Sequence, residues 1–360
     1  MFKKLQLPLW TILTPILAWI AYFAMALNLG DLYIIALIAG LIGSVLAAVH
    51  HAEVVAHRVG EPYGTLLLAL AITIIEVALI VSLMLTGGPE THALARDTVL
   101  AAVMIILTGI IGVCLLVGGL KFKEQVFGLH GVSAALVTLT AILVLTLILP
   151  NYTTSETGPF YSPVQLGFVA IISLILYGTF VMVQTVRHRD FFLPPDGESD
   201  EDLHASPPAK TTAITSGILL LVCLGIVVLL AKSIAPDIEA TVISIGAPKS
   251  LVGVIIAGVV LLPEGLAAYR AVKQNRLQTS LNLALGSALA SIGLTIPAVA
   301  VVAMITGMTI TLGIDMKATV LLLLAQFTIM LSLATGRTNV LQGVVLLVIF
   351  VTYLFTIVLP

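Results

Sequence analysis

Two glutamates occupy positions where an acidic side chain is costly. Glu76 lies within the apolar run LLLALAITIIEVALIVSLML, and Glu264 lies within VIIAGVVLLPEGLAAY. An ionised carboxylate at the centre of a membrane helix costs roughly 3 kcal/mol on insertion scales, so acids at that depth usually have a function. The alternative is a purely structural role, in which a protonated glutamate forms a hydrogen bond to a neighbouring helix. Two such acids at equivalent positions of a repeat favour function over that alternative.

The chemistry open to these two carboxylates is competitive binding of protons and cations. Burial disfavours their ionised forms, whereas a cation between them favours those forms, so the same oxygens bind either species. Oxygen-only ligation suits hard ions such as Ca²⁺ or Na⁺. Two carboxylates neutralise a dication, which favours Ca²⁺ without excluding monovalent ions. We therefore expect Glu76 and Glu264 to bind the cation and the proton, and to be the metal ligands.

A proline directly precedes the second glutamate. Pro263 removes a backbone donor and frees the carbonyl of Val259. Such a carbonyl could turn towards an ion, or the proline could simply kink the helix. In the first half, Ile75 precedes Glu76, so a proline before the deep glutamate occurs only in the second half.

The two glutamates end similar stretches in the two halves of the chain. Each stretch has an acid, a Gly-X-Pro turn, an apolar run and the deep glutamate, namely Glu53, Gly60-Glu61-Pro62 and Glu76, and Glu239, Gly246-Ala247-Pro248 and Glu264. The acids are separated by 23 and 25 residues, respectively. This similarity indicates an internal repeat.

Histidines gather near the end of the second apolar run. His50, Glu53 and His57 would share one face of a helix. The order of these residues is not HExxH, which argues against a zinc protease. His50 and His57 could form a pH-responsive vestibule, or they could lie at a solvated helix end.

Polar residues within the apolar runs are candidates for an ion pathway. They could instead hold helices together by hydrogen bonds. The candidates are Thr73, Thr108, Asn282, Ser287, Ser291 and Gln326.

The elements that must position these residues are membrane helices. Of the 360 residues, 59% are hydrophobic and 9% are charged, against roughly 25% charged in a soluble domain. The net charge of -2 offers no basic patch for nucleic acid. Eleven apolar runs are long enough to span a bilayer: 8–28, 31–52, 64–86, 97–119, 130–149, 164–186, 212–233, 242–268, 278–305, 316–335 and 338–359. The first run is longer than a signal-peptide core, so we interpret it as a membrane helix.

The distribution of basic residues predicts the orientation. With Lys3 and Lys4 in the cytoplasm, 12 of the 16 lysines and arginines fall on that side. The four on the other side are Arg96, Lys232, Lys249 and Lys317. We expect a cytoplasmic N-terminus and a periplasmic C-terminus.

The runs divide into a leading helix and two five-helix repeats. The predicted divisions are 1–30 for the leading helix, 31–187 for the first repeat, 188–211 for an acidic cytoplasmic linker and 212–360 for the second repeat. The linker is either a solvated tether or a cation-sensing segment. An odd number of helices per repeat makes the repeats inverted, which is typical of secondary transporters. The expected fold is an all-α integral membrane protein.

Two stretches resemble a known family. HHAEVVAHRVGEPYGTLLLALAITIIEVALI and LLPEGLAAYRAVKQNRLQTSLNLALGSALASIGLTIPAVA are similar to the repeat regions of the Ca²⁺:cation antiporter superfamily, and most of all to its bacterial ChaA-type sodium(potassium)/calcium–proton branch. The resemblance implies eleven helices and alternating access driven by the proton gradient in a bacterial inner membrane. It also implies that Glu53 and Glu239 are vestibule or gating acids, and that Ser287 matches the serine of a Gly-Ser pair.

The chain departs from this family before the deep glutamates and in the fourth predicted helix, which has no clear Gly-Ser pair. It lacks the Gly-Asn pair that precedes the glutamate in many calcium/proton exchangers. Loss of those amide ligands implies a broader range of Na⁺, K⁺ and Ca²⁺. We expect cations, protons and lipid as partners, with a homo-oligomer left open, and no cofactor beyond the transported ion. The rival hypotheses are a passive cation channel and an intramembrane enzyme, but no nucleophile or metal-ligand set at membrane depth supports an enzyme.

Overall fold

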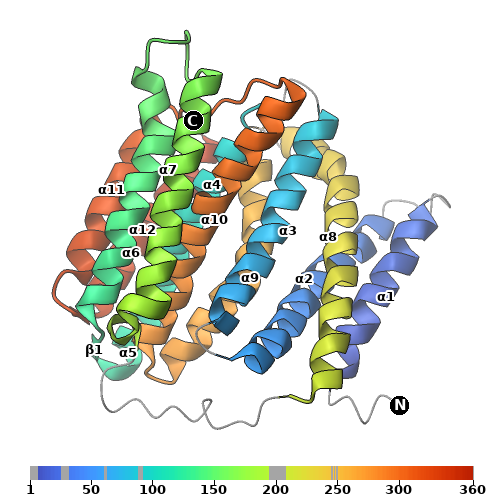
Figure 1. The fold of residues 1–360 in the computed structure, drawn as a ribbon, viewed down its shortest axis with the longest axis horizontal. Coiled ribbons are helices and arrows are strands. Elements are labelled where there is room, and N and C mark those ends of the chain that lie inside the picture. The colour runs from blue at the N-terminus through green and yellow to red at the C-terminus, as the bar shows by residue number, and fades with distance from the viewer. Residues whose placement is uncertain are drawn as a thin grey trace. The chain divides into compact units, whose positions relative to one another are not determined.

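The computed structural model describes residues 7–25, 32–60, 63–87, 92–193, 208–244, 246, 248 and 250–359 (Figure 1). Over these residues the chain is almost wholly helical. The strands found there are β1 (Gln125–Val126) and β2 (Arg337–Thr338), which pair antiparallel. The predicted all-α fold is confirmed.

Eleven helical spans lie within the described ranges, as the sequence predicts. Three spans contain a π-helical turn: α4 (Leu94–Met104) continues through η4 (Ile105–Ile110) into α5 (Ile111–Phe122), α6 (Leu129–Leu143) continues into η5 (Val144–Ile148) and η6 (Leu149–Tyr152), and α7 (Pro163–Met182) continues into η7 (Val183–Arg187). The other helices are α1 (Leu9–Ala24), α2 (Leu32–Val59), α3 (Tyr63–Gly87), α8 (Lys210–Ser244), α9 (Ser250–Lys273), α10 (Leu277–Thr306), α11 (Met316–Leu333) and α12 (Val340–Val358). The short η8 (Arg189–Phe192) follows η7.

The lengths and hydropathy of these helices suit a bilayer. Within the described ranges, nine spans have at least 18 residues and enough apolar character to cross a membrane. Helix α1 and residues Leu70–Leu85 of α3 are shorter apolar helices. The chain is a multi-pass membrane protein.

The largest errors in the predicted boundaries lie at one turn, where the span expected to end at 233 continues in α8 to Ser244. The run expected at 242–268 begins too early, because residues 242–244 still belong to α8 and α9 begins at Ser250. The chain turns at Gly246, whose φ of +75° is a left-handed conformation that glycine adopts easily. The hydropathy of the run gave no sign of this boundary, although the Gly-X-Pro turn at 246–248 lies at it.

Parts of two other predictions fall outside the described residues. The structure describes the acidic linker only at its ends, where η8 covers Arg189–Phe192 and α8 begins at Lys210. Residues 194–207 are not described. Of the first Gly-X-Pro turn, Gly60 alone is described.

The chain forms two compact units. Unit 1 comprises Met1–Leu83 and Asp200–Gly246, and unit 2 comprises Met84–Ser199 and Ala247–Pro360. In unit 1, α1, α2 and α8 pack against one another. In unit 2, α10 packs against α6, α7 and α9, while α9 also packs against α4 and α5. The division into repeats at 31–187 and 212–360 stays a prediction.

Close contact between α5 and α12 depends on glycine. A Cβ atom at Gly343 would lie 2.3 Å from the backbone nitrogen of Leu116, and one at Gly119 would lie 2.5 Å from that of Val340. Small residues that allow backbones to approach are the usual basis of helix pairing in membranes. The close packing of α5 against α12 in unit 2 therefore depends on Gly119 and Gly343.

A hydrogen bond anchors the chain between η6 and α7. The hydroxyl of Tyr161 donates to the carbonyl of Leu145 at 2.5 Å. Burial raises the pKa of Tyr161 to about 12, so this donor keeps its proton at physiological pH. Ser162 then caps α7 in a capping box with Gln165.

Candidate functional site

Glu264 is joined to the neighbouring helix in unit 2. It lies on α9 and is partly buried. The hydroxyl of Ser287 on α10 donates a hydrogen bond to Oε2 of Glu264. Helices α9 and α10 pack directly, so this contact lies at their interface (Figure 1). The structure therefore brings together two residues that the sequence singled out.

A π-helical turn packs beside the same part of α9. The turn η4 carries Thr108, which is fully buried and donates to the carbonyl of Met104 at 2.5 Å. A Cβ at Gly265 would lie 3.3 Å from the side chain of Ile110, so the residue after Glu264 faces η4 closely. Such π-helical turns occur often at functional sites. Thr108 uses its hydroxyl within its own helix here.

Proline does not end the helix that carries Glu264. Helix α9 runs without interruption from Ser250 to Lys273, with Pro263 inside it. The proline therefore removes one internal hydrogen bond and leaves the carbonyl of Val259 without its usual donor.

Glu76 belongs to unit 1. It lies on α3 and is only 5% exposed. Thr73, also buried, lies one turn earlier on the same face of α3. A carboxylate and a hydroxyl thus occur together around each deep glutamate. The two glutamates belong to different units, so the neighbours of each are described within its own unit.

The predicted vestibule residues lie near helix ends. Glu53 and His57 are exposed in the last two turns of α2, and His50 is half-buried next to Trp10. Glu239 is partly buried near the end of α8. Their roles as gating acids or pH-responsive groups stay predictions.

The sequence missed the most deeply buried histidine. His51 is 0% exposed and joins three helices of unit 1. Its Nε2 donates to the carbonyl of Thr11 on α1 at 3.1 Å, and its Nδ1 lies 3.4 Å from the hydroxyl of Ser216 on α8. A carbonyl can only accept, so the proton lies on Nε2. Nothing in the sequence near His51 pointed to partners so distant along the chain.

The remaining pathway candidates lie in unit 2. Ser291 is buried on α10, one turn after Ser287. Gln326 on α11 accepts a hydrogen bond from Thr140 on α6 at 3.0 Å, which joins two helices. A part in ion transport stays a prediction for each of them.

Asn282 belongs to a network at the start of α10. Its amide donates to the carbonyl of Phe192 at 2.6 Å, and its side-chain oxygen accepts from Gln278 at 2.9 Å. Gln278 is fully buried and also accepts from the backbone of Gly128 at 2.6 Å. This network connects the first described residues of the linker to α10. The sequence gave Gln278 no role.

The arrangement around Glu264 suits a hard cation as cargo. A carboxylate and a hydroxyl offer oxygen ligands only, as Ca²⁺ and Na⁺ prefer. Among the residues that the structure describes, no cluster of three or more His, Cys, Asp or Glu side chains could form a metal site. A site with few charged ligands fits an ion that must be released as well as bound.

Comparison with known proteins identifies the family. The sequence model of the family described as "Sodium/calcium exchanger protein" matches residues 30–186 and 215–359. A protein of Sinorhizobium fredii (strain NBRC 101917 / NGR234), y4hA, named provisionally as an ionic transporter, is 45% identical over 99% of this chain and 98% of its own length. The sodium-potassium/proton antiporter ChaA of Escherichia coli (strain K12) is 37% identical over 88% of this chain and 86% of its own.

The fold is also similar to a solved structure. The crystal structure of the H⁺/Ca²⁺ exchanger CAX superposes with a TM-score of 0.72 at 15% identity, covering 96% of this chain and 87% of that one. The predicted family resemblance is confirmed, as is the prediction that the chain is not an enzyme. The chain belongs to the sodium/calcium exchanger protein family and is an ion transporter.

Proposed function

We propose that the chain is a cation/proton antiporter that exports Ca²⁺, Na⁺ or K⁺ in exchange for protons by alternating access. Glu76 and Glu264 bind the cation or the proton competitively. Protons entering from outside protonate the carboxylates and release the cation. Deprotonation on the cytoplasmic side prepares the site for the next ion.

The hydrogen bond from Ser287 to Glu264 is the observation that carries this proposal. A carboxylate at that depth needs a donor to stay ionised, and the hydroxyl supplies one. When a cation binds, the carboxylate oxygens and the hydroxyl oxygen can all turn towards it. When a proton binds instead, the carboxyl group keeps a hydrogen-bond partner, so either state is tolerated.

The relatives support both the coupling ion and a broad cation range. ChaA, at 37% identity, is named as an antiporter of sodium, potassium and protons. CAX, similar in fold, is named as an exchanger of protons and Ca²⁺. The chain lacks the Gly-Asn pair that would supply amide ligands, so we propose that it accepts monovalent ions as well as Ca²⁺.

We propose a bacterial inner membrane as the location, with the N-terminus in the cytoplasm and the C-terminus in the periplasm. The distribution of lysine and arginine supports this orientation. The family model matches two separate stretches, 30–186 and 215–359, which supports two inverted repeats around the acidic linker.

A cation panel in proteoliposomes tests the proposal. Purified protein is reconstituted with a pH-sensitive dye inside, and Ca²⁺, Na⁺, K⁺ or the bulky control choline is added outside. Proton movement that depends on the added cation, saturates with it and stops when a protonophore collapses the gradient supports an antiporter. Cation flux that leaves the internal pH unchanged when membrane potential is clamped indicates a channel and overturns the proposal.

A further inference from the structure

A pocket with several polar side chains in its lining lies at the end of unit 2 that carries the starts of α4, α9 and α11. It has a volume of about 260 Å³. Its lining includes Asp97 in the first turn of α4, Asp315 at the N-cap of α11, and Tyr353 and Thr356 near the end of α12. Three helices far apart in sequence thus contribute oxygen-bearing side chains to the lining of one space. The sequence analysis gave Asp97, Asp315 and Tyr353 no role.

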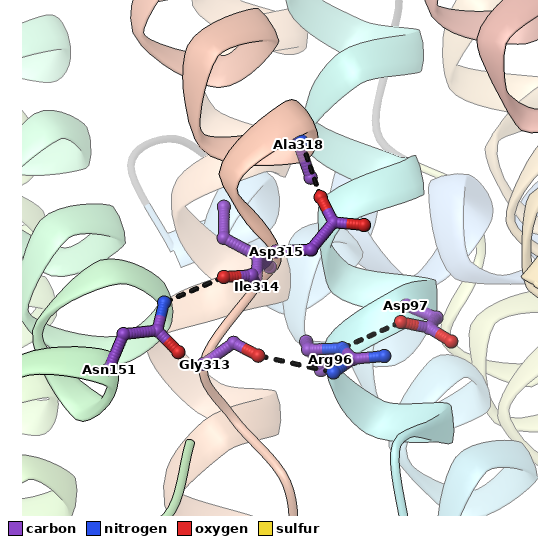
Figure 2. Close-up of polar contacts among 7 residues, drawn as sticks. All are labelled: Arg96, Asp97, Asn151, Gly313, Ile314, Asp315 and Ala318. Atoms are coloured by element: carbon purple, nitrogen blue, oxygen red, sulfur yellow. Dashed lines mark hydrogen bonds and ion pairs between the residues drawn. The ribbon is translucent and has the colours of Figure 1, made fainter. Parts of the chain in front are cut away.

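The positive groups at the pocket already have acceptors. Arg96 donates from Nε to Oδ1 of Asp97 at 2.7 Å and from a terminal nitrogen to the carbonyl of Gly313 at 3.1 Å, as Figure 2 shows. Lys317 donates to the carbonyl of Thr356 at 2.8 Å. Because these donors are engaged, the pocket is poorly suited to an anion.

The two carboxylates keep acceptor capacity. Asp315 uses Oδ1 to accept from the backbone of Ala318 at 2.6 Å, which fixes it at the start of α11 (Figure 2). Asp97 uses Oδ1 for Arg96. Among the described residues, the second oxygen of each carboxylate accepts no hydrogen bond. Both carboxylates line the same pocket, and a cation held between them would offset their mutual repulsion.

Tyr353 is an independent sign of a ligand. It is only 5% exposed, yet it lines the pocket. Within the described part of the chain its hydroxyl makes no hydrogen bond. A hydroxyl that lines a pocket and has no protein partner is available to a water molecule or an ion there.

We propose that this pocket is a second site for a hard cation such as Ca²⁺ or Na⁺, held by Asp97, Asp315 and the hydroxyl of Tyr353. It is separate from the deep glutamate. Ser250 lines the pocket and begins the helix that carries Glu264 fourteen residues later, a rise of roughly 21 Å. Since Arg96 and Lys317 offset the two negative charges, binding is weak, roughly in the millimolar range.

Luminescence of terbium, a Ca²⁺ mimic that tyrosine sensitises, tests the site. The full chain carrying Glu264→Gln is purified and titrated with Tb³⁺ while tyrosine is excited. The added change Tyr353→Phe removes most of the sensitised signal, and Asp315→Asn weakens Tb³⁺ binding about tenfold, since ligand charge sets affinity at such sites. Excess Ca²⁺ displaces the signal.

Matched variants exclude general effects. Tyr269→Phe removes a tyrosine elsewhere in unit 2, and Glu124→Gln removes an exposed carboxylate at β1; neither changes the signal. Asp97→Asn also removes the hydrogen-bond partner of Arg96. If that variant fails to fold, the Asp315→Asn and Tyr353→Phe variants alone decide whether the proposal holds. A Tb³⁺ signal equal in the parent and Tyr353→Phe proteins overturns the proposal, and loss of transport by Glu264→Gln has no bearing on it.

Discussion

Ser287 on α10 donates its hydroxyl hydrogen to the carboxylate of Glu264 on α9. This contact joins two of the helices at the centre of unit 2, beside the π-helical turn that carries Thr108. It gives a deep acid the donor that an ionised carboxylate requires. The account of transport developed above starts from this pair.

Replacing that donor weakens cation binding. Hydrogen bonds to charged groups contribute about 1.5–3 kcal/mol, so Ser287→Ala raises the apparent KM for the cation by about tenfold or more. The cation dependence of proton flux in proteoliposomes measures this change. Ser173→Ala is the matched control, because Ser173 is also buried but bonds only to Val169 in its own helix. Equal KM values for the two variants would contradict the assigned role of Ser287.

Protons and cations compete at the proposed site. Lowering the pH on the side where the cation enters protonates the carboxylates and raises the apparent KM for the cation, while saturating cation restores the maximal rate. Initial rates measured over a grid of pH and cation concentration show this pattern. A maximal rate that falls with pH at an unchanged KM would show that protons act elsewhere.

The contact between α5 and α12 admits no larger residue than glycine. Gly343→Ala places a methyl group against the backbone of Leu116 and lowers the free energy of unfolding in detergent by about 1–3 kcal/mol. Gly178→Ala on α7 is the control, since its Cβ would meet nothing within 4 Å. There alanine is neutral or stabilising by about 0.5–1 kcal/mol. A destabilisation equal at both positions would indicate a general effect of glycine replacement.

The His51 contacts hold unit 1 together. His51→Leu leaves Ser216 without its buried partner and lowers the unfolding free energy by about 1–3 kcal/mol. His57→Leu, on the exposed face of the same helix, leaves it nearly unchanged. A double-mutant cycle with Ser216→Ala isolates the pair. If the losses of unfolding free energy caused by His51→Leu and by Ser216→Ala are simply additive, the hydrogen bond between the two side chains does not contribute to stability.

Much of the fold could be predicted from the sequence because lipid imposes strong constraints. Apolar runs near 20 residues can only be helices, and ten of the eleven predicted spans begin within a few residues of the observed helices. The span expected from 242 failed because an apolar run does not record a turn within it. Gly246 makes that turn through its backbone conformation, which hydropathy does not detect.

The site was predictable only in part. Unusual burial of charge singled out Glu76 and Glu264, and the resemblance singled out Ser287. His51, Gln278 and Tyr353 are ordinary in the sequence, since their surroundings come from helices that lie far away along the chain. The π-helical turn at Thr108 likewise has no local sequence signal.

The most direct measurement compares proton-coupled cation flux in everted vesicles from cells expressing the parent protein, Glu76→Gln, Glu264→Gln and the exposed control Glu124→Gln at equal membrane levels. Glutamine keeps the size of the side chain but cannot release a proton. We predict that both deep variants lose cation-dependent dissipation of the pH gradient by about a hundredfold or more, since each removes a charge at membrane depth, while Glu124→Gln keeps it. Normal dissipation by both deep variants would contradict the account.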